Sequence, residues 1–345
     1  MILKLLEKAT LPSFLDSLLA ESELCAPVRR DGGGFSFSVV ESAADVALDY
    51  RTTVLSPKKF LLPPRETIFR FRRQAPVGVR AELDERSRVV FGVRPCDINA
   101  LWMLDAALSD EPADALYEAR RSRALIIGLN CLQPCDDYAF CGSMGSNVAD
   151  SGFDLMLNDV GDAYVAEVGT SAGLAALARW GGAKEVRYEH RSLLREAQRR
   201  RAEEWPRPLD VEVNSLPRLL EDSYDSLLWE VLGEKCLGCG SCTLVCPTCY
   251  CFDVWDELDL DLVEGKRVRR WDSCQLRDFA LVAGGENFRE KRSSRTRHRF
   301  FRKVKWLPER YGRVACVGCG RCSRACLAKI NPIEVYNQLR GGVAW

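Results

Sequence analysis

The sequence has few histidines, no excess of charge and no long apolar run near its start. Its 345 residues include two histidines, and 49 Lys and Arg residues balance 49 Asp and Glu residues. With two imidazoles, the sequence gives little support for zinc sites that combine Cys with His, or for a catalytic triad. The neutral balance gives no general attraction to nucleic acid. Residues 1–20 carry alternating charges and lack the features of a signal peptide or a membrane span, so we expect a cytoplasmic protein.

The glycine motifs of nucleotide-binding folds are also missing. No G-x-G-x-x-G follows an expected strand, and no G-x-x-x-x-G-K-[ST] occurs. The run Asp31-Gly-Gly-Gly34 is interpreted as a turn, because a lone glycine run is weak evidence for phosphate binding. We therefore expect partner chains, and not this one, to hold nicotinamide and flavin.

Cysteine is the abundant chemical group, with 16 residues in the chain. Eight of them form two runs with the spacing C-x2-C-x2-C-x3-C, and Pro247 follows the first run. This is the bacterial ferredoxin spacing for two [4Fe–4S] clusters, in which the fourth Cys of each run ligates the cluster of the other run. The prediction is cluster 1 at Cys236, Cys239, Cys242 and Cys326, and cluster 2 at Cys316, Cys319, Cys322 and Cys246.

Zinc knuckles and a disulfide framework are the alternatives for these two runs. Zinc sites are typically built from two CxxC pairs or from Cys with His, and the only histidines are His190 and His298. Disulfides are not favoured without a secretory signal. Two matching runs of four Cys therefore favour iron–sulfur clusters.

The predicted fold is an α/β N-terminal domain followed by an α+β, bacterial-ferredoxin-like dicluster domain. The boundary is placed at residues 217 and 218, after a linker over residues 206–217, and the second domain has a long insert at residues 247–315. Apolar patterning predicts buried strands at 88–94 and 124–129, a hairpin at 153–157 and 163–168, helices at 2–19, 95–108 and 171–180, and a charged helix at 193–205. The run Arg199-Arg-Arg201 on that last helix is expected to be a solvated face.

A second group of thiols follows the two predicted buried strands. Cys96 comes after the first strand, and Cys131, Cys135 and Cys141 come after the second. If the strands are parallel neighbours, their carboxyl ends meet at the sheet edge where α/β folds place ligands. These four thiols are thus predicted to hold a third [4Fe–4S] cluster, cluster 3. The alternative is that they are small buried residues near a sheet end.

Four cysteines remain outside these sets. Cys249, Cys251 and Cys274 are three thiols, one short of an ordinary four-thiolate site, so packing around the clusters is favoured. The alternative is that these three, with a fourth donor, hold the third cluster instead of the N-terminal set. Cys25 is expected to be inert.

The insert between the two Cys runs begins acidic and ends basic, from Arg289 to Lys305. The neutral chain and the missing recognition motifs argue against nucleic acid. A docking surface or a cationic cover over the clusters is favoured, and a solvated loop stays open as the alternative.

Several segments together resemble a family of iron–sulfur subunits. They are Val93-Arg-Pro-Cys-Asp97, Phe140-Cys-Gly-Ser-Met-Gly145, Cys246-Pro-Thr-Cys-Tyr-Cys-Phe252, Trp271-Asp-Ser-Cys274 and Cys316-Val-Gly-Cys-Gly-Arg-Cys322, with residues 55–60. The family includes the beta subunit of cytoplasmic NAD(P)-linked hydrogenases (sulfhydrogenases) and the A subunit of anaerobic sulfite reductase. One departure is that Leu327, not Pro, follows Cys326.

The resemblance implies an electron relay docked against a flavin subunit that exchanges electrons with NAD(P)H. The expected function is an electron-transfer subunit without catalytic residues. It would relay electrons between that flavin/NAD(P)-binding partner and a catalytic subunit of hydrogenase, sulfite reductase or heterodisulfide reductase type. The alternative is a reductase subunit that itself reduces a substrate at the N-terminal cluster.

Overall fold

The structure, a computed structural model, describes residues 2–342. Within that range its larger sheet has eight strands in the order β10-β1-β9-β8-β7-β6-β2-β3. The strands are β1 (Ile2–Glu7), β2 (Glu23–Arg29), β3 (Phe35–Val40), β6 (Arg88–Val93), β7 (Ala124–Leu129), β8 (Leu155–Asp159), β9 (Ala163–Val168) and β10 (Lys184–Glu185). The pairs β2–β6, β6–β7 and β7–β8 are parallel, and the outer pairs are antiparallel.

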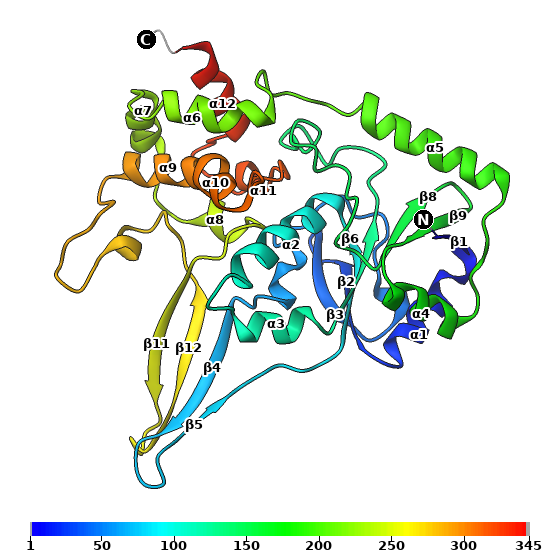
Figure 1. The fold of residues 1–345 in the computed structure, drawn as a ribbon, viewed down its shortest axis with the longest axis horizontal. Helices are drawn as coiled ribbons and strands as arrows, with labels where there is room; N and C mark the ends of the chain where they lie inside the picture. The colour runs from blue at the N-terminus through cyan, green and yellow to red at the C-terminus, as the bar shows by residue number, and fades with distance from the viewer. Residues whose placement is uncertain (1, 343–345) are drawn as a thin grey trace.

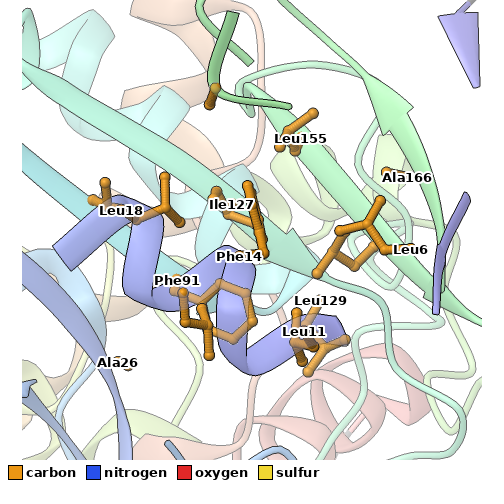
Figure 2. Close-up of a cluster of buried hydrophobic side chains, with 14 of the residues drawn as sticks. Leu6, Leu11, Phe14, Leu18, Ala26, Phe91, Ile127, Leu129, Leu155 and Ala166 are labelled. Atoms are coloured by element: carbon orange, nitrogen blue, oxygen red, sulfur yellow. The ribbon is translucent and has the colours of Figure 1, made fainter. Parts of the chain in front are cut away.

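Helices cover both faces of this sheet, because its central strands are buried on both sides. On one face, α1 (Leu11–Leu19) and α4 (Ser171–Trp180) pack over a core that includes Phe91 and Ile127. Figure 2 shows Phe14 and Leu18 of α1 in that core. On the other face, α2 (Pro95–Leu108) and α3 (Ala115–Arg121) pack on a second core. The buried strands and the helices at 95–108 and 171–180 confirm those sequence predictions.

The predicted helix at residues 2–19 is wrong in its first part, where β1 forms. β1 pairs antiparallel with β9, from Ile2 opposite Val168 to Glu7 opposite Ala163. Leu6 joins the core under α1, whereas Leu5 packs into a separate cluster with Leu194 on the other face. Successive side chains on opposite faces are the period of a strand, so the apolar residues that suggested a helix serve both faces of a sheet.

A second sheet of four strands is formed by chain segments that lie far apart in sequence. Its order is β11-β12-β4-β5, with β11 (Phe252–Leu258), β12 (Glu264–Trp271), β4 (Arg65–Arg72) and β5 (Gly78–Ala81). Figure 1 shows it extending away from the larger sheet. The insert at residues 247–315 thus contributes a hairpin to a sheet shared with the N-terminal part. The predicted boundary at residue 217 falls inside α6 (Leu216–Asp222) and stays a prediction.

A helical layer completes the chain. It contains α6, α7 (Leu228–Lys235), α9 (Arg292–Phe301), α10 (Leu307–Tyr311) and α12 (Pro332–Gly341), with a π-helical turn at Arg302–Trp306. Trp229, Phe300 and Tyr336 are the largest side chains in its core. The short helices α8 (Ser241–Leu244) and α11 (Arg321–Arg324) lie within the two Cys runs. The helix α5 (Tyr188–Glu203) crosses beside the larger sheet (Figure 1). No helix among residues 2–342 is both long and apolar enough to span a membrane.

Candidate iron–sulfur sites

The two Cys runs adopt the same local fold, which their glycines permit. Gly240 and Gly320 have φ of 77° and 73°, a conformation that side chains rarely adopt, and each begins a short helix. A Cβ at Gly318 would lie 2.6 Å from the backbone of Phe140. Glycine at this position therefore lets the second run pack against the loop that carries Cys141.

The cluster 1 thiols line one cavity. Cys236, Cys239, Cys242 and Cys326 surround it together with Cys322. Backbone N–H groups point at two of the sulfurs, from Gly238 to Cys236 at 3.4 Å and from Ile330 to Cys326 at 3.3 Å. Such N–H groups favour a negatively charged sulfur.

The cluster 2 thiols are also neighbours, although they come from both runs. Burial is the main cause that raises the pKa of Cys316 to about 12, and the nearby thiols of Cys322, Cys246 and Cys319 act in the same direction. Burial likewise raises the pKa of Cys319 to about 11, again with Cys246 and Cys322 nearby. Cys246 is therefore placed beside the second run and away from the cavity that its own run lines.

The cluster 3 thiols converge at the carboxyl edge of β6 and β7. These strands are parallel neighbours, with Val93 opposite Gly128, so Cys96 and Cys131 follow adjacent strand ends. The thiols of Cys131 and Cys135 lie close enough to Cys141 to raise its pKa, which burial brings to about 12. The indole N–H of Trp205 donates to Cys141 Sγ at 3.3 Å. Cys96 also lies near Cys141, and burial raises its pKa.

The three thiol sets lie in a row. The loop of cluster 3 contacts the second Cys run directly, because Phe140 N donates to Gly318 O at 2.8 Å and Ser146 Oγ to Val317 O at 2.5 Å. Cys319 of cluster 2 lies near both Cys96 and Cys141. At the other end, Cys322 lies near Cys242 of cluster 1. The order of the thiol sets is the cluster 3 thiols, the cluster 2 thiols and the cluster 1 thiols.

Buried basic side chains surround these thiols, and the sequence analysis did not assign them. Arg299 lies near Cys242, Cys322 and Cys246, and Lys303 lies near Cys246 and Cys249. The spacing of Arg299 and Lys303, one helical turn, could have indicated a shared face. Both come from the basic end of the insert, which is helical and buried on the face that carries them, while Lys291 and Arg292 at its start are exposed.

Arginines are buried beside the cluster 3 thiols as well. Arg94 donates to the carbonyls of Leu129 and Asn130 at 3.2 Å, and it lies near Cys131. Arg201 was expected on a solvated face, but only 5% of it is exposed. It donates to Asn158 Oδ1 at 3.0 Å and also lies near Cys131, because α5 turns this side chain toward the sheet edge. No feature of the run Arg199-Arg-Arg201 distinguishes its last member from the other two.

A buried ion pair joins the N-terminal part to the second Cys run. Arg321 Nη1 and Nη2 lie 2.7 and 2.8 Å from the two carboxylate oxygens of Asp97, and both side chains are at most 2% exposed. Asp97 is next to Cys96 in α2, and Arg321 lies beside Cys319. The pair therefore lies between the cluster 2 thiols and the cluster 3 thiols.

The thiol sets fit iron–sulfur clusters better than single metal ions. Among residues 2–342, no three Cys, His, Asp or Glu side chains converge closely enough to hold one ion. A cubane binds each thiolate through a different iron, so its ligands stand further apart. Burial raises the pKa of most of these thiols, so a bound metal is needed to keep them deprotonated. Buried Arg and Lys side chains supply the charge that such an anionic group requires.

The remaining cysteines fall into two groups. Cys25 is fully buried in β2, where burial raises its pKa to about 12, and it packs with the apolar core under α2. Cys249, Cys251 and Cys274 lie at the base of the β11–β12 hairpin, beside Cys246. They are therefore grouped with the clusters, whereas Cys25 is not.

Comparisons with known proteins agree with this chemistry. A family model described as a 4Fe-4S dicluster domain matches residues 235–330, which include both Cys runs. Sulfhydrogenase 2 subunit beta of Pyrococcus furiosus is 36% identical over 335 residues, which cover 96% of each chain. No solved structure matches the chain. The mixed α/β fold therefore carries a C-terminal dicluster domain that binds [4Fe–4S] clusters.

Proposed function

Since this chain belongs to the sulfhydrogenase beta subunit family, we propose that it is the electron-transfer subunit of a multi-subunit oxidoreductase. It relays electrons between a flavin/NAD(P)-binding partner and a catalytic subunit of hydrogenase, sulfite reductase or heterodisulfide reductase type. Bound [4Fe–4S] clusters supply one-electron chemistry at potentials that nearby charges and hydrogen bonds adjust. The relative is named as a beta subunit, which supports assembly of this chain with other chains.

The observation that carries this proposal is the row of three thiol sets. Cys319 lies beside the cluster 3 thiols, and Cys322 lies beside the cluster 1 thiols, so the second run is placed between the other two sets. The proposed ligands are those predicted from the sequence for clusters 1, 2 and 3. A ferredoxin-like fold for residues 218–345 is part of the same proposal, because crossed ligation by Cys246 and Cys326 belongs to that fold.

Each end of the row reaches the surface, as a relay between two partners requires. At the cluster 1 end, Cys239 is exposed, and Leu237 and Leu327 beside it are 59% and 75% exposed. Exposed apolar side chains at a redox centre are suited to a protein partner. At the other end, Cys131 lines two open surface cavities at the edge of the larger sheet. We assign the two partners to these two ends.

The experiment that tests the relay uses the full chain purified without oxygen. Dithionite or a reduced viologen should reduce it, whereas NAD(P)H should reduce it only after the flavin partner is added. Iron and acid-labile sulfide should each be about twelve per chain for three cubanes, or about eight for two. Oxidation of NAD(P)H by the pure chain without flavin would refute the relay, and zinc without sulfide would refute the clusters.

Cluster 3 has its own test. Replacing Cys131 by Ala should lower iron by about four per chain while the spectra of clusters 1 and 2 persist. The matched control is Cys25→Ala, since Cys25 is a buried Cys of the same sheet that lies away from the thiol sets. Equal iron in both variants would show that Cys131 holds no cluster.

The second candidate function is reduction of a substrate at cluster 3. The cavities that Cys131 lines favour it, because Arg94 and Arg201 place positive charge at that edge. Under this alternative, the dithionite-reduced chain alone would turn over an added acceptor, such as an anionic sulfur compound. Cys131→Ala would abolish that turnover. If the chain is only a relay, the wild-type protein alone shows no such turnover.

A further inference from the structure

A buried hydrogen-bond network joins the last thiol of the first Cys run to the start of the second run. Thr248 Oγ1 lies 3.3 Å from Cys246 Sγ and 2.7 Å from the carbonyl oxygen of Ala315, which directly precedes Cys316. Lys303 Nζ donates to the same Thr248 oxygen, and Ala315 N donates to Lys303 O at 2.8 Å. Thr248, Lys303 and Ala315 are each at most 5% exposed, so the network is buried.

Segments that lie far apart in the sequence fix this network around Cys246. Cys249 N donates to Cys246 O at 3.3 Å, so residues 246–249 form a turn that carries the threonine back toward the sulfur. Lys303 comes from the π-helical turn that follows α9, a kind of turn that is frequent at functional sites. From the N-terminal part, Lys58 Nζ donates to the carbonyls of Cys246 and Cys249 at 3.0 and 2.8 Å. The backbone of the turn is therefore held at both ends.

The Thr248 hydroxyl has one hydrogen and two acceptors within reach, Cys246 Sγ and Ala315 O. A sulfur bound to iron carries no proton, so only the hydroxyl can donate between Thr248 and Cys246. A charged acceptor makes the stronger hydrogen bond, which favours the sulfur when its cluster holds an added electron. Lys303 donates to the hydroxyl oxygen and so polarises it, and it also places a cation near Cys246. Both effects stabilise the added electron.

We propose that Thr248 and Lys303 are positioning residues that hold Cys246 on cluster 2 and raise the reduction potential of that cluster. This inference rests on the cluster 2 ligands of the proposed function. Because the cluster 2 thiols lie in the middle of the row, electrons that pass between the two ends use this cluster. A middle cluster with a potential far below those of its neighbours would slow that transfer. The network thus serves transfer between the two ends of the relay.

The test measures the potential of cluster 2 by redox titration and EPR, in full-length protein purified without oxygen. Cys246→Ser identifies cluster 2 by the signal that it alters. Thr248→Val should lower the reduction equilibrium constant of cluster 2 about tenfold, or about 59 mV for one electron, because a hydrogen bond to a charged sulfur is lost. Lys303→Met should lower it at least as much, since a unit charge is removed as well. Thr248→Ser keeps the hydroxyl and should restore the wild-type potential.

The matched control is Thr243→Val. Thr243 is a buried threonine of the first Cys run, and its hydroxyl bonds to Gly240 O at 2.8 Å and to Ser273 Oγ at 2.6 Å, not to a sulfur. This variant should keep the wild-type potential of cluster 2. Since it also loses a buried hydroxyl, it separates the effect on the sulfur from general damage to the fold.

Wild-type potentials of cluster 2 in both Thr248→Val and Lys303→Met would overturn the inference, and so would equal shifts of all three clusters. If Lys303→Met does not fold, the isosteric Thr248→Val decides. Loss of about four iron atoms in Thr248→Val, but not in Thr248→Ser or Thr243→Val, would also support the inference, because the hydroxyl then holds Cys246 in place. Failure of the proposed function looks different, because the wild-type protein would then show no EPR signal that Cys246→Ser alters.

Discussion

Asp97 and Arg321 form a buried ion pair whose two charges should shift the reduction potentials of clusters 2 and 3 in opposite directions. Arg321 lies beside Cys319 and Cys96, and its charge is neutralised by Asp97 through two short contacts. Asp97→Asn leaves the Arg321 cation uncompensated beside the clusters, which favours their reduction. Arg321→Met leaves an uncompensated carboxylate, which disfavours it. The double variant removes both charges, so its reduction potentials should return close to those of the wild type.

The magnitude follows from Coulomb's law. At an effective dielectric constant of about 20 and a separation of about 8 Å, a unit charge and one electron interact by about 2 kcal/mol. For a one-electron couple this is roughly 90 mV. Asp97→Asn should raise, and Arg321→Met should lower, the potentials of both clusters by about this amount. Each single variant should also lose about 3–5 kcal/mol of stability, because it leaves a buried charge unpaired.

Redox titration followed by EPR, without oxygen, measures these shifts. The matched control is Asp110→Asn, because Asp110 also pairs with an arginine, Arg310, but at the surface. That control should shift the potentials by only a few millivolts, since solvent screens exposed charges. Shifts of the same sign in both single variants would refute the reasoning, and so would a double variant that stays far from the wild-type potentials.

Three further outcomes are expected. Cys246→Ser should damage the cluster of Cys316, Cys319 and Cys322 and spare that of its own run, which EPR of the separate clusters will show. Trp205→Phe removes the N–H at 3.3 Å from Cys141 Sγ and should lower the cluster 3 potential by roughly 20–60 mV, for about 0.5–1.5 kcal/mol of hydrogen bond. Burial, with Arg289 and Arg302 nearby, lowers the pKa of His298 to about 4. The contribution of neutral His298 to stability is complete above about pH 6.5 and is lost as the pH falls toward 4. The free energy of unfolding should therefore fall between pH 7 and pH 5.5 in the wild type. In His298→Gln this fall should be smaller by about 1 kcal/mol, as measured by chemical unfolding at the two pH values.

The Cys spacing predicted the chemistry of the site because ligand geometry is local. Each run needs only its own turn and its glycines to present three thiols, so the pattern is complete between Cys236 and Cys246 and again between Cys316 and Cys326. The convergence of the N-terminal thiols could be predicted for a different reason. Two apolar strands each followed by Cys predict a shared sheet edge, and β6 and β7 are parallel neighbours.

Other features depend on pairing between distant segments, which a single sequence does not encode locally. β1 has a helix-like apolar pattern but pairs with β9, more than 150 residues away. β4 joins β12 although a domain boundary was expected between them. The orientation of Arg201 depends on where α5 lies against the sheet, so its neighbours Arg199 and Arg200 are exposed while it is buried. Charge alone suggested a surface for all three.

Iron removal should unfold part of this chain and leave the rest intact. Lys58, Arg299 and Lys303 are at least nine-tenths buried, face thiols, and have no carboxylate partner within residues 2–342. Without anionic clusters, each would be an uncompensated buried charge, at a cost of several kcal/mol. Cluster binding and folding are therefore coupled here. By contrast, the larger sheet around β6 and β7 is stabilised by apolar cores.

Hydrogen exchange measured by mass spectrometry on the iron-free protein will separate the two regions. We expect rapid exchange in α9, α8 and α11, and slow exchange in β6, β7 and α1. Reconstitution with iron and sulfide should restore protection of the first group. Lys303→Met should reduce the difference between iron-free and iron-loaded protein, because it removes one of the charges that drive unfolding. Equal protection of α9 with and without iron would show that its buried cations are satisfied by the protein alone.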